Sequence, residues 1–168
     1  MSEPDRGGGE PAEHRRYAAY VTALDAFAEA KGADEAGEAA LVLAVLRDED
    51  QVMAQSAVVR HVDRRAAEFL TDPRFPGWCQ ALSGAVAGRD FPTRRLREWS
   101  LLRAIALGEP WTPEELSAAT DWCQRTAVDG RFPVSPAALT LLAEHGRTRR
   151  VRNAAVRPAA PSGTGLST

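Results

Sequence analysis

In this 168-residue chain, the histidine and cysteine side chains are the ones that most readily bind metals or act as nucleophiles. The chain has three histidines and two cysteines: His14, His61, His145, Cys79 and Cys123. No histidine has a cysteine or a second histidine three or four residues away, the spacing that places two ligands on one face of a helix. Only His14 has a carboxylate at such a spacing, that of Glu10, and a site with two ligands would bind a metal weakly. We therefore expect neither a metal site nor a bound cofactor.

Groups of neighbouring carboxylates could act as acids and bases. They are Asp34, Glu35 and Glu38; Asp48, Glu49 and Asp50; and Glu114 and Glu115. Each group lies at an expected helix start, where capping and the helix dipole stabilise an acid by roughly 0.5–1 kcal/mol. The sequence has no glycine-rich phosphate loop after a strand, no Gly-x-Ser-x-Gly elbow and no catalytic Cys–His signature. We therefore expect no catalytic residues and no enzyme, although distant helices could assemble a site that no motif reveals.

Arginine provides the strongest local charge signal. One cluster lies near the C-terminus and a second lies in the middle of the chain: Arg147, Arg149, Arg150, Arg152 and Arg157, and Arg94, Arg95 and Arg97. Guanidinium groups on a helix could contact phosphates, with an affinity that falls as salt rises. The C-terminal cluster could instead complement the negative end of its own helix. Nucleic-acid binding through both clusters requires that they lie on one face.

The four tryptophans are the other candidates for recognition, because aromatic side chains are favoured at protein interfaces. They are Trp78, Trp99, Trp111 and Trp122. Trp99 and Trp122 belong to helical apolar stripes and are expected in the core. Trp78 and Trp111 lie beside proline-bearing breaks, where part of the ring is expected to stay exposed. The candidate partner-binding residues are therefore Trp78, Trp111, Arg94, Arg95, Arg149, Arg150 and Arg152.

The composition indicates one soluble helical domain. Hydrophobic residues make up 44% and charged residues 26%, as in ordinary globular proteins, and the net charge is -2. Alanine and leucine dominate the apolar residues, which favours helices over strands. No apolar run approaches the roughly 18–20 residues that cross a bilayer, and the N-terminus does not resemble a signal peptide. These features predict an all-α protein of the reducing cytoplasm that does not enter a membrane.

Apolar residues at helical spacing predict helices over residues 11–31, 33–46, 52–58, 63–70, 78–86, 91–106, 112–128, 135–146 and 148–155. Thr112-Pro113 and Ser135-Pro136 are expected to begin helices, because each joins a capping hydroxyl to a proline at the first helical position. Gly32, Gly108 and Gly146 are expected to end them. A single helical domain over residues 11–157 follows, with disordered tails over residues 1–10 and 158–168.

Two segments, residues 41–62 and 139–155, share the order helix, short polar turn, helix. The run Val151-Arg152-Asn153-Ala154-Ala155 resembles the opening of the second helix of a HEAT repeat. The leucines in the first helix of each segment resemble those that end the first helix of a HEAT repeat. The resemblance implies a short α-solenoid of antiparallel helix pairs that stack to share a core. An irregular helical bundle is the alternative.

A helical protein without a reaction centre is expected to act as a scaffold or adaptor that binds another protein, in a bacterial cytoplasmic system. The alternative is a nucleic-acid-binding protein that uses the two arginine clusters. The sequence leaves the oligomeric state open.

Overall fold

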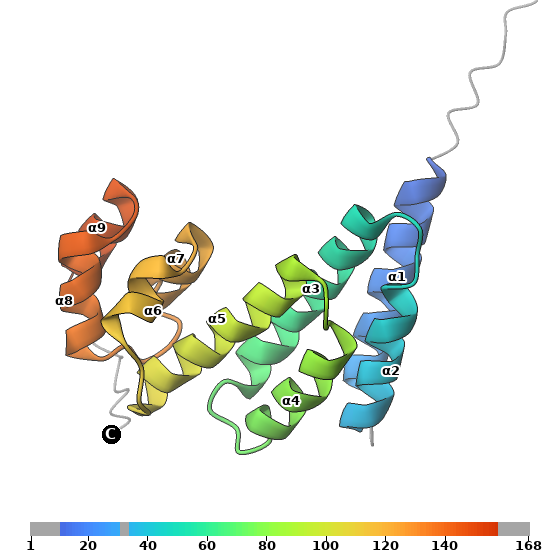
Figure 1. Cartoon of the computed structure of the whole chain (residues 1–168), viewed down its shortest axis with the longest axis horizontal. Helices are drawn as coiled ribbons and strands as arrows, with labels where there is room; N and C mark the ends of the chain where they lie inside the picture. The colour runs from blue at the N-terminus through green and yellow to red at the C-terminus, as the bar shows by residue number, and fades with distance from the viewer. Residues whose placement is uncertain (1–10, 31–33, 158–168) are drawn as a thin grey trace, which may run out of the picture. The chain divides into compact units, whose positions relative to one another are not determined.

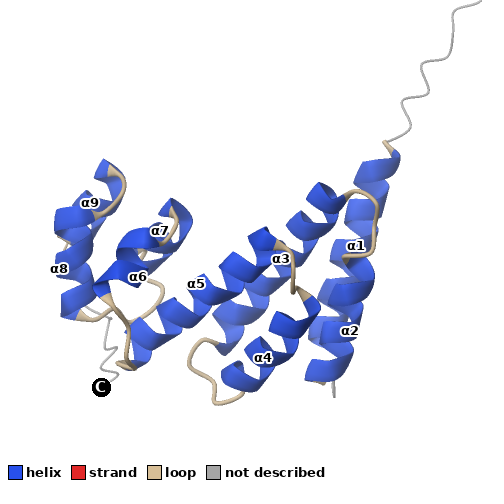
Figure 2. Ribbon diagram, viewed as in Figure 1, coloured by secondary structure: helices blue, strands red, loops and turns tan. Residues whose placement is uncertain are grey.

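The computed structural model describes residues 11–30 and 34–157 (Figure 1). Every regular element in these ranges is a helix, which confirms the predicted all-α class (Figure 2). The helices are α1 (Ala12–Glu29), α2 (Glu35–Val45), α3 (Gln51–Phe69), α4 (Phe75–Ala85), α5 (Asp90–Leu107), α6 (Pro113–Ala118), α7 (Asp121–Val128), α8 (Pro136–His145) and α9 (Arg149–Ala155). The predicted tails and the stop at Gly32 lie outside the described residues.

Local side-chain chemistry sets most helix starts. Thr112 forms a capping box: its hydroxyl accepts from the Glu115 backbone N–H at 3.2 Å, and the Glu115 carboxylate accepts from the Thr112 N–H at 2.8 Å. Asp34 caps α2 and Ser135 caps α8, as the sequence predicts. Gly108 follows α5 with a φ of 70°, a backbone conformation that favours glycine.

Three predicted helix boundaries are wrong. The helix expected over residues 78–86 begins earlier, at Phe75, because Pro76 and Gly77 belong to its first turn. Residues 63–70 do not form a separate helix, because α3 runs through them without a break and Asp63 accepts from Arg95 Nη1 at 2.8 Å rather than capping a new start. The helix expected over residues 112–128 is divided into α6 and α7. Ala119 and Thr120 have extended ψ angles of 152° and 161° at the division, and the Thr120 hydroxyl caps α7.

The described residues form two compact units. The first extends to Arg97 and the second begins at Glu98, so the division falls within α5. The single helical domain expected over residues 11–157 stays a prediction.

In the first unit, α2 packs chiefly against α4, and α1 packs chiefly against α3. Its core includes Leu24, Val42, Val58, Val62 and Leu82, each with at most 1% of its surface exposed. The segment that resembles a HEAT repeat, residues 41–62, spans α2 and α3, but these two helices contact each other less than each contacts its main partner. Whether the helices form a solenoid or a bundle stays open, and the HEAT resemblance stays a prediction.

In the second unit, α9 packs against both α8 and α7, and α6 packs against α8. Its core includes Leu116, Cys123, Leu142 and Val151. The turn between α8 and α9 is closely packed at Gly146. A methyl group added there would lie 2.5 Å from the Leu142 carbonyl oxygen and 2.7 Å from Val151 Cγ1.

We expect Gly146→Ala to lower the free energy of unfolding by about 1–3 kcal/mol, because the added methyl group meets backbone that cannot move aside easily. Gly84→Ala is the matched control. A methyl group at Gly84, within α4, meets nothing within 4 Å, so this variant should gain about 0.5–1 kcal/mol from helix propensity. Urea denaturation followed by circular dichroism measures both. Equal stabilities for the two variants would contradict the close packing at Gly146.

Candidate functional site

A basic groove lies in the second unit, along α7, the turn after it, and α9. It has a volume of about 1060 Å³. We call it the arginine groove, because five arginines line it together with a tryptophan: Arg125, Arg131, Arg149, Arg150, Arg157 and Trp122. The arginines come from three separate stretches of sequence, so the fold rather than the local sequence gathers them.

The buried side of α9 determines which of its residues reach the groove. Val151 and Ala155 are 0% and 7% exposed, and they hold one face of the helix against the core. Arg149, Arg150 and Asn153 line the groove from α9 itself, and Arg157 lines it from the second residue after the helix ends.

Two polar contacts hold α9 against α7. The Thr148 hydroxyl caps α9 and also donates to Asp121 Oδ1 at 3.1 Å. The Gln124 side chain is fully buried: its oxygen accepts from the Arg147 backbone N–H at 2.8 Å, and its nitrogen donates to the Leu116 carbonyl at 2.9 Å. These contacts fix the two walls of the groove relative to each other.

The groove is strongly positive. Its lining has five arginines against one acid, Asp129, which gives a formal charge of +4. Arg125 is partly neutralised by Asp121, whose Oδ2 lies 3.1 Å from Arg125 Nε. Among the described residues, Arg149, Arg150 and Arg157 form no ion pair with an acid. Several guanidinium groups gathered without acidic partners repel one another, and a bound anion would relieve that repulsion.

The structure places the predicted C-terminal arginines in different surroundings. Arg149 and Arg150 are exposed and line the groove. Arg152 does not line it: its Nη1 donates to the Gly146 carbonyl at 2.6 Å, which supports the turn before α9. Sequence reasoning missed Arg125 and Arg131, because each is an isolated arginine without a charged cluster around it.

The predicted residues of the middle of the chain do not join this groove. Arg94 is exposed, whereas the Arg95 side chain is 11% exposed and lies 2.8 Å from Asp63. Both belong to the first unit, and the groove belongs to the second. The requirement that both clusters share a face therefore stays a prediction. Trp111 is half-buried in the second unit.

The expectation that part of the Trp78 ring stays exposed is wrong. Trp78 is 0% exposed, because its ring packs against Phe69 and Phe75 with centroids 5.9 and 5.5 Å away. The proline beside it, Pro76, lies in the first turn of α4 and does not open the core. The indole N–H donates to a buried carboxylate, that of Glu38, at 2.9 Å.

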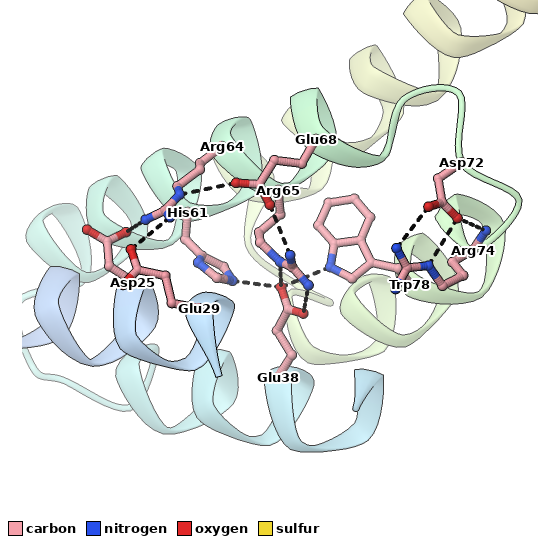
Figure 3. A network of polar contacts seen from close by, with 10 residues as sticks. All are labelled: Asp25, Glu29, Glu38, His61, Arg64, Arg65, Glu68, Asp72, Arg74 and Trp78. Atoms are coloured by element: carbon pink, nitrogen blue, oxygen red, sulfur yellow. Dashed lines mark hydrogen bonds and ion pairs between the residues drawn. The ribbon is translucent and has the colours of Figure 1, made fainter. Parts of the chain in front are cut away.

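Glu38 is the centre of a buried polar cluster that joins three helices (Figure 3). We call Glu38, His61, Arg65 and Trp78 the Glu38 cluster. The Glu38 carboxylate on α2 accepts from His61 Nε2 at 2.8 Å and from Arg65 Nε and Nη2 at 3.1 Å each, both on α3. Figure 3 shows these side chains and Trp78 of α4 converging on the carboxylate. Because a carboxylate only accepts, Nε2 of His61 carries the proton in this contact.

The chemistry of the Glu38 cluster is that of a structural contact. Burial raises the pKa of Glu38, but hydrogen bonds from His61, Arg65 and Trp78 outweigh burial and bring the pKa to about 2. A carboxylate with so low a pKa is a weak base. Glu38 and His61 are each 1% exposed, so neither presents its atoms to a substrate in this structure.

Within residues 11–30 and 34–157, no group of three or more histidine, cysteine, aspartate or glutamate side chains is arranged to hold a metal ion. None of the helices in the same ranges has the length and hydrophobicity that a membrane span requires. A scan against protein-family models and searches of curated proteins and of solved structures found no match to this chain.

Proposed function

We propose that this chain is a non-enzymatic interaction protein that binds an anionic partner through the arginine groove. The observation that carries the proposal is the groove itself: it gathers five arginines from α7, from the turn after α7, and from α9 and the residues just after it, with a single acid in the lining. Anion binding needs positive groups held in place before the ligand arrives. The contacts of Thr148 and Gln124 provide that rigidity.

The sequence favours another protein as the partner, with this chain as a scaffold or adaptor in the bacterial cytoplasm. An acidic segment of such a protein would supply carboxylates to the guanidinium groups. Nucleic acid is the second candidate, and the same groove favours it. In that case Arg125 and Arg131 act together with Arg149, Arg150 and Arg157, and the middle cluster is not required.

We expect the Arg149→Ser, Arg150→Ser double variant to elute from a heparin column at a clearly lower salt concentration than the unmodified protein. When an arginine that contacts the polyanion is removed, binding releases fewer counterions from the polyanion. A lower salt concentration is then enough to displace the protein from the column. Both side chains are exposed and have no ion-pair partner among the described residues, so the circular dichroism spectrum should not change.

The matched control is the Arg94→Ser, Arg97→Ser double variant, which removes the same charge from exposed positions in the first unit. Its elution should move much less. Equal shifts for both double variants would mean that heparin responds to total charge alone, and the proposed groove would then have no special role.

A further inference from the structure

We infer that the partner of the arginine groove is single-stranded nucleic acid, and that both its phosphates and its bases contact the groove. This inference rests on the proposed function and specifies the chemical class of the anionic partner. The first support is size. The groove volume of about 1060 Å³ lies just above the roughly 300–1,000 Å³ of small-molecule pockets, so the groove suits a segment of a chain better than a single ion.

The arrangement of the arginines supports a ligand with a regular series of anions. Arg125 lies on α7, Arg131 in the turn after it, and Arg149, Arg150 and Arg157 on or just after α9. One phosphate or one carboxylate could contact only part of this set. A phosphodiester strand carries a charge at every nucleotide, and the planar guanidinium group matches the geometry of phosphate oxygens.

The remaining lining supplies groups that a base can use. Trp122 is half-buried in the groove wall, and its ring is held by Trp99 in an edge-to-face contact with centroids 5.4 Å apart. An aromatic ring among arginines is the combination on which unpaired bases stack. The Asn153 amide also lines the groove and can donate to and accept from a base edge. An acidic peptide offers no base to stack, and a duplex keeps its bases inside.

Fluorescence anisotropy of labelled ligands tests the inference. The ligands are an oligothymidylate, an abasic strand of the same length, a duplex of the same length, and an oligoglutamate with the same number of charges. We expect the oligothymidylate to bind most tightly, and the abasic strand to bind roughly tenfold more weakly or worse, because it keeps the phosphates and loses stacking.

The salt dependence locates the binding. For the oligothymidylate, the slope of log affinity against log salt should fall by about 1.4 in the Arg149→Ser, Arg150→Ser variant, since each phosphate contact on a single strand contributes about 0.7. The Arg94→Ser, Arg97→Ser variant should keep the full slope. An equal loss in both variants would overturn the assignment to the groove.

The ligand series separates the two proposals. If oligoglutamate binds as tightly as oligothymidylate, with the same sensitivity to the groove variant, the inference fails and the proposed binding of an anionic partner stands. Equally tight binding of the duplex or of the abasic strand would overturn the role assigned to unpaired bases. If none of the four ligands binds in a salt-dependent way, both proposals fail.

Discussion

Replacing Glu38 with alanine is expected to lower the free energy of unfolding by about 3–5 kcal/mol, the range for breaking a buried ion pair from one side. The change leaves the Arg65 guanidinium with 10% of its side chain exposed and without its main acceptor. It also removes the acceptor of the His61 and Trp78 N–H groups, which are buried. Because domains are stable by only about 5–15 kcal/mol in total, this loss is large.

Urea denaturation followed by tryptophan fluorescence and circular dichroism measures this effect. The control is Glu68→Ala: Glu68 also pairs with Arg65, at 3.0 Å, but its side chain is 44% exposed, and its loss should cost less than about 1 kcal/mol. If Glu38→Ala does not fold, Trp78→Phe removes the indole N–H donor together with part of a fully buried ring, and the two losses together should cost more than about 1 kcal/mol. A Glu38 variant as stable as the Glu68 variant would show that the cluster contributes nothing.

Acidification is expected to remove about 3 kcal/mol of stability through Glu38 alone. Its pKa is about 2 in the folded protein against an ordinary value of 4.5. A carboxyl group whose pKa is lower in the folded state binds fewer protons there than in the unfolded chain. Its contribution is therefore complete above about pH 4.5 and is lost as the pH falls towards 2.

The measurement is a series of urea denaturations from neutral pH to about pH 2, with Glu38→Gln as the comparison because this side chain does not titrate. The difference in unfolding free energy between the unmodified protein and the variant should be largest at neutral pH and should shrink by about 3 kcal/mol across that window. A constant difference over the whole series would mean that the pKa of Glu38 is not lowered by folding.

Features encoded by adjacent residues could be predicted from the sequence. The Thr112-Pro113 start needs only its own hydroxyl, ring and the glutamate three residues later, and all of these lie side by side in the chain. The apolar pattern does not predict the division between α6 and α7, although Thr120 caps α7. A threonine in the middle of a helical pattern has no local feature that distinguishes a cap from a helix interior.

Features that join distant residues could not be predicted. The nearby Pro76 predicts that part of the Trp78 ring stays exposed, whereas the indole is buried and its N–H donates to Glu38, 40 positions earlier in the chain. Arg125 and Arg131 were overlooked for the same reason. Their function as groove residues depends on the packing of α7 against α9, and neither helix contains a sequence signal for that contact.

The three donors to Glu38 lie 23, 27 and 40 positions after it, on α3 and α4. Until both helices are in place, docking α2 would remove the carboxylate from water without returning all of its hydrogen bonds. Partly assembled forms of the first unit are therefore unfavourable, and we expect α2, α3 and α4 to unfold together in one cooperative step. In amide hydrogen exchange, the most protected amides of these three helices should open with the same free energy.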